Sequence, residues 1–467
     1  MLKHFFLLWV LLSSTLAQAK LSHVETFTLD DCIAIALQKH QSLKVSNAQV
    51  AMAEALYQQA MSAYWPRLAA KVSADRADED RTFNVEGSFS LPQSLSGPLG
   101  MLIGSPVGAL PLDLKIKLYD RDLVRASINL TYPVFTGLKR PAIVGQAEKG
   151  VQIAEQGRRK TSLEVVRDVK KYYYAAQFAM QMEQLAADTL ERFKVLEDLT
   201  ERLYQNGSLK VKKTDYLRTK TITALNRSML NEAVYARELA HEALGNAMGQ
   251  AWDAQYHLAE SQKPVAITTE LQELIDAANH FNPELQQLSL AVQLAEHRIT
   301  EAQSGYYPMV GVQARAYKLW NGFDGGLIND DNRDGWNIGV GMQWDLFSGF
   351  ETAGKVNHAK AQQRQIKSQR VLLDEGMALQ IKQQFLRIRS SGKQIKNTES
   401  AYGSARENRQ LHVRAYQQEM VETKDVIQAQ LVEGFAKSAY YRSRYALEIA
   451  LTSLEYLIGR NIEHLSP

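Results

Sequence analysis

One arrangement of acidic residues in the sequence has the spacing of a metal site. Asp330, Asn332 and Asp334 followed by Gly335 match the first half of a calcium-binding loop. The twelfth position of such a loop is a glutamate that binds the ion with both oxygens, but this chain has Gly341 there. The segment also lies between two expected strands. We therefore interpret it as an exposed turn and predict no metal site.

The other reactive residue types are not arranged for catalysis either. His241-Glu242 lacks the second histidine of a zinc-protease helix, and the ten histidines show no ligand spacing. The acidic residues between 75 and 80 fit a hydrated loop, and the sequence has neither a phosphate-binding glycine loop nor a nucleophile elbow. Cys32 is the single cysteine, which excludes an intrachain disulfide, and it fits a buried helix position. We predict no enzyme activity and no cofactor.

Composition excludes two further classes of protein. The 467 residues are 45% hydrophobic and 22% charged, which is typical of a folding chain rather than a disordered one. The 54 basic and 51 acidic residues leave a net charge of +3. This near balance offers no general electrostatic basis for nucleic-acid binding, so no nucleic-acid partner is expected.

The N-terminus predicts export. Residues 1–19 combine Lys3, an apolar run from Phe5 to Leu12 and a closing Ala-Gln-Ala, which is the pattern of a secretory signal peptide. The mature chain is then expected to begin at Lys20. Beyond it, no stretch reaches the ~18 apolar residues that a membrane helix needs. The protein is therefore either soluble in the periplasm or crosses an outer membrane as β-strands.

The chain contains an internal duplication. Three ungapped registers follow one another, and together they relate two halves of similar plan: Tyr-Trp-Pro at 64–66 with Tyr-Tyr-Pro at 306–308, Pro-Val-Phe-Thr-Gly at 133–137 with Asp-Leu-Phe-Ser-Gly at 345–349, and Asp215 with Asp425. The offset shortens along the chain because the first half has the longer insert between its strands. Within that insert, residues 82–91 are expected to form a small hairpin.

Each half is expected to contain two short helices, two strands and two long helices. In the second half Asn282 is placed to cap a helix that begins at Pro283. The expected segments are the signal peptide (1–19), first short helices (20–66), first strands with the insert (67–135), first long helices (136–250), a linker (251–269), second short helices (270–308), second strands (309–347), second long helices (348–460) and a tail (461–467).

The four strand segments alternate between apolar and polar residues. In the last of them, Trp336, Ile338 and Val340 are separated by Asn337 and Gly339. Each segment has about the 9 to 12 residues that a tilted strand needs to cross a membrane. A soluble sheet with one wet face shows the same alternation. Four strands cannot close a barrel, and lipid does not tolerate open sheet edges, so a membrane sheet would require several copies of the chain.

The long helices have the apolar spacing of coiled coils. Between residues 139 and 206 the only proline is Pro141, at the expected helix start, and the span of about 65 residues corresponds to ~100 Å. Apolar residues recur at steps of three and four, as at Val165, Val169 and Tyr172. One narrow seam is therefore buried while much of the helix surface stays wet.

Together these features resemble the TolC family of outer-membrane efflux proteins. The resemblance lies in the duplicated plan, the Tyr-Trp-Pro and Tyr-Tyr-Pro helix ends, the strand ends at 133–137 and 345–349, and Asp-Val-Ile-Gln-Ala at 425–429. It implies a mainly α-helical chain with a membrane β-barrel. It also implies a homotrimer with a twelve-stranded barrel in outer-membrane lipid and a twelve-helix barrel in the periplasm. Such channels dock on an inner-membrane pump through a periplasmic adaptor, and the pump supplies the energy.

The resemblance also implies which residues control the periplasmic entrance. Asp425 matches the first aspartate of the family's aperture ring, and the second is replaced by Gln428. Thr214 and Asp215 match a pair that holds the helical tip closed, with Tyr416 as the tyrosine partner. The latch arginine is replaced by Val421. The alternative for both aspartates is that they are solvated residues at helix starts, where Asp is common.

The tips themselves are the expected adaptor-docking surface. Gly207 suits a positive φ in the first turn, and Glu419 stands where the family has glycine in the second. Lys210, Lys212 and Lys213 make the first tip basic, which favours an acidic adaptor surface. We hypothesise that Asp425 and Asp215 form a cation-favouring constriction.

The sequence therefore predicts a passive, trimeric outer-membrane exit duct that extends into the periplasm and serves an efflux pump or a type I secretion system. The alternative is a periplasmic coiled-coil adaptor or scaffold protein. Adaptors have one helical hairpin and lipoyl-like β modules, whereas this chain repeats its hairpin and has membrane-like strands. Neither interpretation identifies the exported substrate.

Overall fold

The computed structural model describes residues 25–89, 110–252, 256–259, 269–323, 327 and 333–462. The expected signal peptide and the Asp330 and Asn332 positions of the calcium-like turn lie outside these residues. The chain divides into two compact units, one of residues 1–53, 151–291 and 366–467, and the other of residues 54–150 and 292–365. No helix of the described residues is both long and apolar enough to span a membrane.

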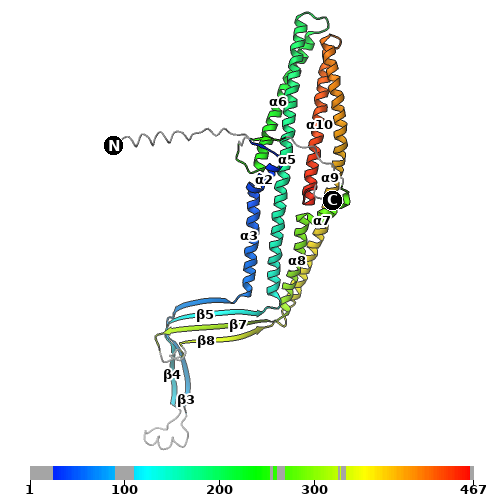
Figure 1. Cartoon of the computed structure of the whole chain (residues 1–467). Coiled ribbons are helices and arrows are strands. Elements are labelled where there is room, and N and C mark those ends of the chain that lie inside the picture. The colour runs from blue at the N-terminus through cyan, green and yellow to red at the C-terminus, as the bar shows by residue number, and fades with distance from the viewer. Residues whose placement is uncertain are drawn as a thin grey trace, which may run out of the picture. The chain divides into compact units, whose positions relative to one another are not determined.

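The first unit is built on two long helical hairpins. Helices α5 (Lys139–Gln205) and α6 (Lys213–Ala247) form one, and α9 (Glu351–Gln417) and α10 (Thr423–Ile458) form the other (Figure 1). The shorter elements of this unit are α2 (Leu29–Lys39), α7 (Leu271–Phe281) and the parallel strands β1 (Glu25–Phe27) and β6 (Tyr256–Leu258). The helices α3 (Gln41–Met61) and α8 (Pro283–Gln303) are divided between the two units, as are α5 and α9, whose first turns belong to the second unit.

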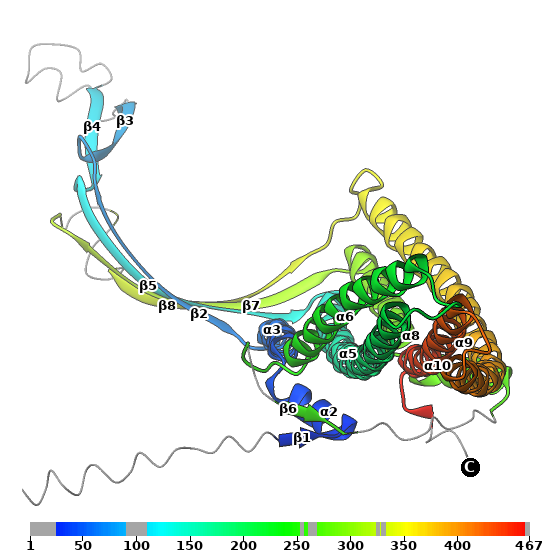
Figure 2. The same ribbon diagram turned by 90° about the horizontal axis from the view of Figure 1, so that it is seen from above.

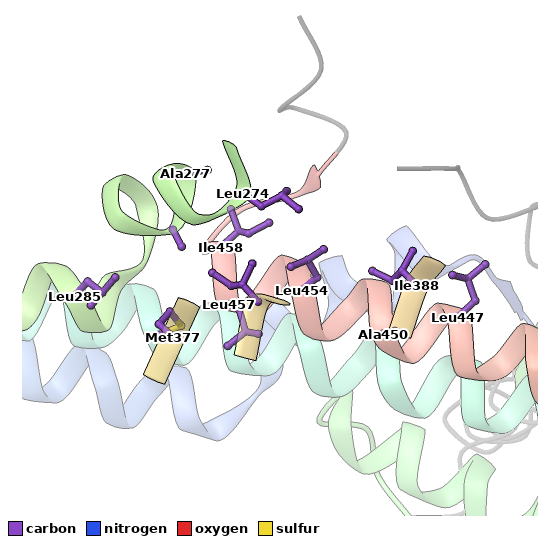
Figure 3. Close-up of a cluster of buried hydrophobic side chains, with 12 residues drawn as sticks. Leu274, Ala277, Leu285, Met377, Ile388, Leu447, Ala450, Leu454, Leu457 and Ile458 are labelled. Atoms are coloured by element: carbon purple, nitrogen blue, oxygen red, sulfur yellow. The ribbon is translucent and has the colours of Figure 1, made fainter. Parts of the chain in front are cut away.

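The core of this unit is a set of separate apolar clusters between helices. In the cluster of Figure 3, Leu274 of α7, Ile381 of α9 and Leu454 of α10 are fully buried. A second cluster joins Cys32 of α2 to Val169 of α5, which confirms the buried helix position expected for the cysteine. The long amphipathic helices therefore bury one seam each, as their spacing predicted.

Asn282 sets the start of α8 as the sequence predicted. Its Oδ1 accepts hydrogen bonds from the backbone N–H of Glu284 (2.8 Å) and Leu285 (3.3 Å), while its Nδ2 donates to the carbonyl of Leu457 (2.8 Å). The side chain is buried, so all of these bonds form away from solvent. One residue thus caps α8 and joins it to the end of α10.

The second unit contains a four-stranded antiparallel sheet. Its strands are β2 (Arg67–Arg76), β5 (Asp122–Phe135), β7 (Met309–Asn321) and β8 (Asp334–Gln343), in the order β2-β5-β7-β8. The sheet is strongly curved (Figure 2). The pairing of β5 with β7 joins the two halves of the duplicated chain in one sheet. β8 ends at Gln343, although the alternation continues to Leu346.

Register makes the sheet two-faced throughout. Odd-numbered residues of β2 pair with odd-numbered residues of β5, and this parity continues into β7 and β8 except next to the bulge at Phe135. We call the two surfaces the odd face and the even face. The even face contains Leu68, Val72, Val124, Ile128, Trp320, Trp336, Ile338, Val340 and Met342, all of them exposed. The alternation predicted from the sequence is thus confirmed as one apolar face.

The insert forms one hairpin that is longer than predicted. Residues 82–91 were expected to contain a complete hairpin, but β3 (Arg81–Phe89) supplies one strand only and pairs with β4 (Leu110–Tyr119). The prediction was wrong because the partner strand lies beyond the turn-rich residues of the insert.

An ion pair lies at the base of the hairpin. The Lys117 ammonium is 2.6 Å from an Asp80 oxygen, and this hydrogen bond is the main cause that lowers the pKa of Asp80 to about 2.

A repeated pair of left-handed residues connects each last strand to its long helix. Gly137 and Leu138 have φ of 61° and 70°, and Gly349 and Phe350 have φ of 61° and 68°. The two sites differ in their surroundings. A Cβ on Gly137 would lie 2.7 Å from the Ser304 carbonyl oxygen, whereas one on Gly349 would meet nothing within 4 Å.

This difference predicts unequal effects of the same substitution. We expect Gly349→Ala to lower the free energy of unfolding by about 1 kcal/mol, because only the left-handed backbone is strained. Gly137→Ala should lower it by roughly 2–4 kcal/mol, because the strain is joined by overlap with a backbone atom. Thermal unfolding in detergent measures both. Equal losses in the two variants would contradict the packing described for Gly137.

Candidate functional site

The first helical tip is a tight turn between α5 and α6. Residues 206–212 connect Gln205 to Lys213, and Gly207 has φ of 76°, which confirms the positive backbone angle predicted for it. A Cβ on Gly207 would meet nothing within 4 Å, so backbone conformation and not space explains the glycine. Lys210, Lys212 and Lys213 are all exposed on this turn.

At the second tip, Glu419 occupies the position equivalent to Gly207. This residue lies in the turn between α9 and α10 and has φ of 53°, an uncommon angle for a residue with a side chain. Its carboxylate accepts a hydrogen bond from the Ser208 hydroxyl (3.1 Å), and its backbone carbonyl accepts one from the Lys210 ammonium (2.6 Å). A glycine could not make the first bond. Glu419 therefore links the two tips of one chain.

Asp215 and Asp425 occupy equivalent positions, each the third residue of the helix that returns from its tip. An oxygen of Asp215 accepts a hydrogen bond from the backbone N–H of Lys212 (3.0 Å), and one of Asp425 accepts from that of Glu422 (3.2 Å). A carboxylate here also interacts favourably with the helix dipole. Within one chain both aspartates are therefore capping residues. Gln428 lies about one turn further along α10 and is exposed.

Ion pairs surround the two capping aspartates. Arg218 lies 3.7 Å from Asp215, and the Lys424 ammonium lies 2.6 Å from a carboxylate oxygen of Glu422. The hydrogen bond and charge of Glu422 raise the pKa of Lys424. Lys424, Glu422 and Arg218 are exposed while Asp215 is partly buried, and pairs that are open to solvent on at least one side contribute little to stability. Their effect is to spread mixed charge over the tips.

Tyr416 is the buried centre of a hydrogen-bonded layer just behind the second tip. It is 3% exposed, and its hydroxyl lies 3.0 Å from the hydroxyls of both Thr200 on α5 and Thr423 at the start of α10. The expected partners were Thr214 and Asp215. Thr214 is exposed, and the described contacts of Asp215 are to Lys212 and Arg218. The structure therefore brings Tyr416 to different residues.

The repeat partner of Tyr416 has no such role. Tyr204 is 40% exposed and its ring stacks on Tyr216, with centroids 6.5 Å apart. The two tyrosines occupy equivalent positions in the duplicated sequence, yet only Tyr416 joins the hairpins. The duplication alone therefore does not tell which of them is structural.

A buried charge cluster lies further along the hairpins and was not predicted. Glu433 of α10 is 2% exposed, and one of its oxygens lies 2.6 Å from Arg409 of α9 and 3.1 Å from Arg192 of α5. Removing either arginine would leave a buried carboxylate short of a partner, which is strongly unfavourable. The sequence signal was only a glutamate on the apolar seam of α10, with partners 24 and 241 residues away.

Metal ligation receives no support from the described residues. Among them, no group of three or more His, Cys, Asp or Glu side chains could hold a metal ion.

Comparison with known proteins places this architecture in a family. The chain matches the family described as Outer membrane efflux protein over residues 32–250 and 274–460. It therefore belongs to that family. No curated protein matches the chain.

Solved structures of outer membrane proteins share the fold. VceC from Vibrio cholerae is 18% identical, with 93% of this chain and 96% of that chain covered and a TM-score of 0.73. The Campylobacter jejuni CmeC outer membrane channel is 14% identical, with 92% and 85% covered and a TM-score of 0.74. The open state of the Neisseria gonorrhoeae MtrE outer membrane channel is also 14% identical, with 93% and 89% covered and a TM-score of 0.69.

Family membership decides between the interpretations of the sequence. The protein is an outer membrane efflux channel of the tripartite pump family and extends into the periplasm, so the adaptor or scaffold alternative is not supported. The predicted fold is confirmed as duplicated, mainly helical, and TolC-like, with two long hairpins and a four-stranded sheet. The family consists of channels, which confirms that the chain is not an enzyme. Channels of this family are trimers in tripartite pumps.

The layer around Tyr416 makes a specific prediction. Tyr416→Phe removes the hydroxyl shared by Thr200 and Thr423, and we expect the tip to lose about 1–2 kcal/mol of local stability. Hydrogen exchange of the amides in the first turns of α10 measures this loss. Tyr204→Phe is the matched control, because its ring is exposed, and should leave the exchange unchanged. Equal protection in both variants would show that the Tyr416 hydroxyl does not stabilise the tip.

Proposed function

We propose that three copies of this chain form a homotrimeric exit duct. Their sheets would complete a twelve-stranded barrel in the outer membrane, and their hairpins a twelve-helix barrel in the periplasm. The observation that carries the proposal is the two-faced sheet with two edge strands. Within the described residues β2 and β8 each have one neighbouring strand in this sheet. Lipid does not tolerate unpaired strand edges, so β2 of one copy is expected to pair with β8 of the next.

The even face supports contact with lipid. Trp336 is 78% exposed and Val340 is 74% exposed in the single chain. Large apolar side chains in such a continuous band are unfavourable in water, at roughly 25 cal/mol for each Å². Hydrocarbon removes that cost. Trp320 and Trp336 lie at the same end of the sheet. Aromatic side chains are common where the strands of a membrane sheet reach the interface between lipid and water.

The helices of the first unit support contact with other copies. On α9, Leu372, Leu379 and Leu386 repeat at steps of seven and are exposed. On α6, Leu225 and Met229 are exposed at a step of four. Steps of four and seven are those of coiled-coil seams, which bury such side chains against a second helix. Since no described element of the chain covers these residues, the proposed partner is the neighbouring copy.

The stripe on α9 can be tested directly. Leu379→Asp places a charge in the proposed seam, and we expect it to abolish the heat-modifiable trimer seen by gel electrophoresis of outer-membrane vesicles. Gln380→Asp, an exposed position beside the stripe, is the control and should leave the trimer intact. A trimer of unchanged heat resistance in the Leu379 variant would exclude this seam. A wild-type chain that stays monomeric in buffer without detergent would contradict the whole proposal.

We also propose that Asp425 and Asp215 line the periplasmic aperture of the trimer. Both lie within the first turn after a tip, so threefold symmetry would bring like charges together near the axis. Such rings of carboxylates attract cations. The neutral Gln428 would weaken the ring, as would the engagement of each aspartate in a helix cap.

Charge and capping can be separated by substituting asparagine. Asp425→Asn keeps a side-chain acceptor for the Glu422 N–H and removes the charge. We expect single-channel recordings to show a lower preference for cations, and Asp215→Asn to show a smaller change in the same direction. Gln428→Ala is the control that alters size without charge and should leave selectivity as it is. Records identical to wild type in both asparagine variants would place the aspartates away from the aperture.

The remaining parts of the proposal concern partners and transport. The exposed Lys212 and Lys213, together with Lys210 and the Glu419 contact, support docking of a periplasmic adaptor that presents an acidic surface. The adaptor would connect the duct to an inner-membrane pump that supplies energy, so that the channel itself conducts passively. The pump would belong to an efflux or a type I secretion system. Residues 1–19 would direct export as a cleaved signal peptide.

A further inference from the structure

The odd face of the four-stranded sheet has a strongly biased charge. Its uncharged residues are mostly small or polar, such as Ser73, Ser127, Asn129 and Asn337. Its charged residues within the bounds of the four strands are one acid, Asp75, and a set of basic residues: Arg67, Lys71, Arg125 and Arg315. The even face has no such bias, because Arg76 lies 3.5 Å from Asp122, and Lys318 is paired in register with Asp334.

Register places the four basic residues in consecutive rows across the sheet. Arg67 is opposite Thr131, and Arg315 is opposite Asn129. Lys71 is opposite Ser127, and Arg125 is opposite Ser73. Residues 131, 129, 127 and 125 follow one another along one face of β5. One cation therefore appears in each of four rows, and rows lie about 7 Å apart along a strand. We call this set the cation ladder.

Most of the ladder lacks an acidic partner. Asp75 lies 3.3 Å from Arg125 and neutralises that residue. Arg315 contacts the ring of Tyr317, 5.6 Å from its centroid, which orients the guanidinium but supplies no charge. Among the described residues neither Lys71 nor Arg67 is within ion-pair distance of a carboxylate, and both are exposed. Three cations per chain thus remain available to a ligand.

We infer that the odd face is an anion path, and that the channel favours substrates with carboxylate, phosphate or sulfonate groups. This inference rests on the proposed trimer, in which the even face meets lipid and the odd face lines the lumen. Three copies would then place nine uncompensated cations around one pore. Like charges at this density repel one another, and a low-dielectric wall focuses their field on the lumen. Mobile anions relieve the repulsion and are concentrated along the path.

The ladder and the proposed aspartate aperture would act in series with opposite preference. Asp425 and Asp215 belong to the helical tips, whereas the ladder belongs to the sheet. Substitutions in one set should therefore change selectivity in the opposite direction from substitutions in the other. The aspartate aperture alone predicts no effect on anion conduction when positive charge is removed from the sheet. Only the cation ladder predicts such an effect.

The test is the reversal potential of the full-length channel in a planar lipid bilayer under a gradient of potassium chloride. The variant is Lys71→Gln with Arg315→Gln, which removes both positive charges and keeps a polar side chain at each position. We expect the chloride-to-potassium permeability ratio to fall by roughly threefold or more. The same two positions changed to glutamate should shift it further. Lys318→Gln is the matched control, because this exposed lysine lies on the even face of β7, and it should leave the ratio unchanged.

Each outcome bears on a different statement. A wild-type chain that forms no conducting trimer would overturn the proposed duct and this inference with it. A conducting wild type whose ratio is the same in the double variant would overturn the anion path alone and leave the duct intact. A shift of equal size in the Lys318 control would place the even face toward the lumen, which also contradicts the inference. Heat-modifiable trimers of all variants confirm that the recordings compare assembled channels.

Discussion

The period-two alternation of the strands, carried in one register across the sheet, is the constraint on which the rest of the molecule depends. It collects the large apolar side chains on the even face and the polar and basic ones on the odd face. A single chain cannot satisfy such a sheet. Among the residues that the structure describes, none covers the even face, and β2 and β8 each have one edge without a neighbouring strand. Because both needs are met by lipid and by further copies, the proposed assembly follows from the sheet.

Duplication supplied two similar halves, and their differences show where each half has a separate task. The strand-to-helix connections keep the same pair of left-handed residues, but only Gly137 is closely packed. At the tips, Gly207 and Glu419 occupy equivalent turn positions and both have a positive φ. Only Glu419 has a side chain, and it accepts a hydrogen bond from Ser208 in the other half. Backbone conformation is thus retained between the halves, while side chains have diverged to join them.

Two polar layers connect the hairpins near the tips. The hydroxyl of Tyr416 joins α5 to the start of α10, and further along Glu433 joins α5 to α9. Separating the hairpins there would break the contacts of Thr200 with Tyr416 and of Arg192 with Glu433, whereas Tyr416 would keep Thr423 and Glu433 would keep Arg409 within the second hairpin. Because Thr200 and Glu433 are buried, losing these cross-hairpin partners is unfavourable. Any movement at the tips must therefore either carry both layers along or break them.

The sequence by itself determined the elements and their faces. Alternation within the strands, heptad-like spacing in the helices, Asn282 before Pro283, and glycine at position 207 are local patterns, and local sterics and hydrogen bonding decide them. Side-chain pairing across elements was determined only by the tertiary structure. Tyr204 and Tyr416 are equivalent in sequence, and Glu433 meets its arginines across three helices. The partner of β3 lies beyond a turn-rich insert. Such contacts depend on which helix and strand faces meet in three dimensions, and the spacing of residues along the sequence does not determine which faces meet.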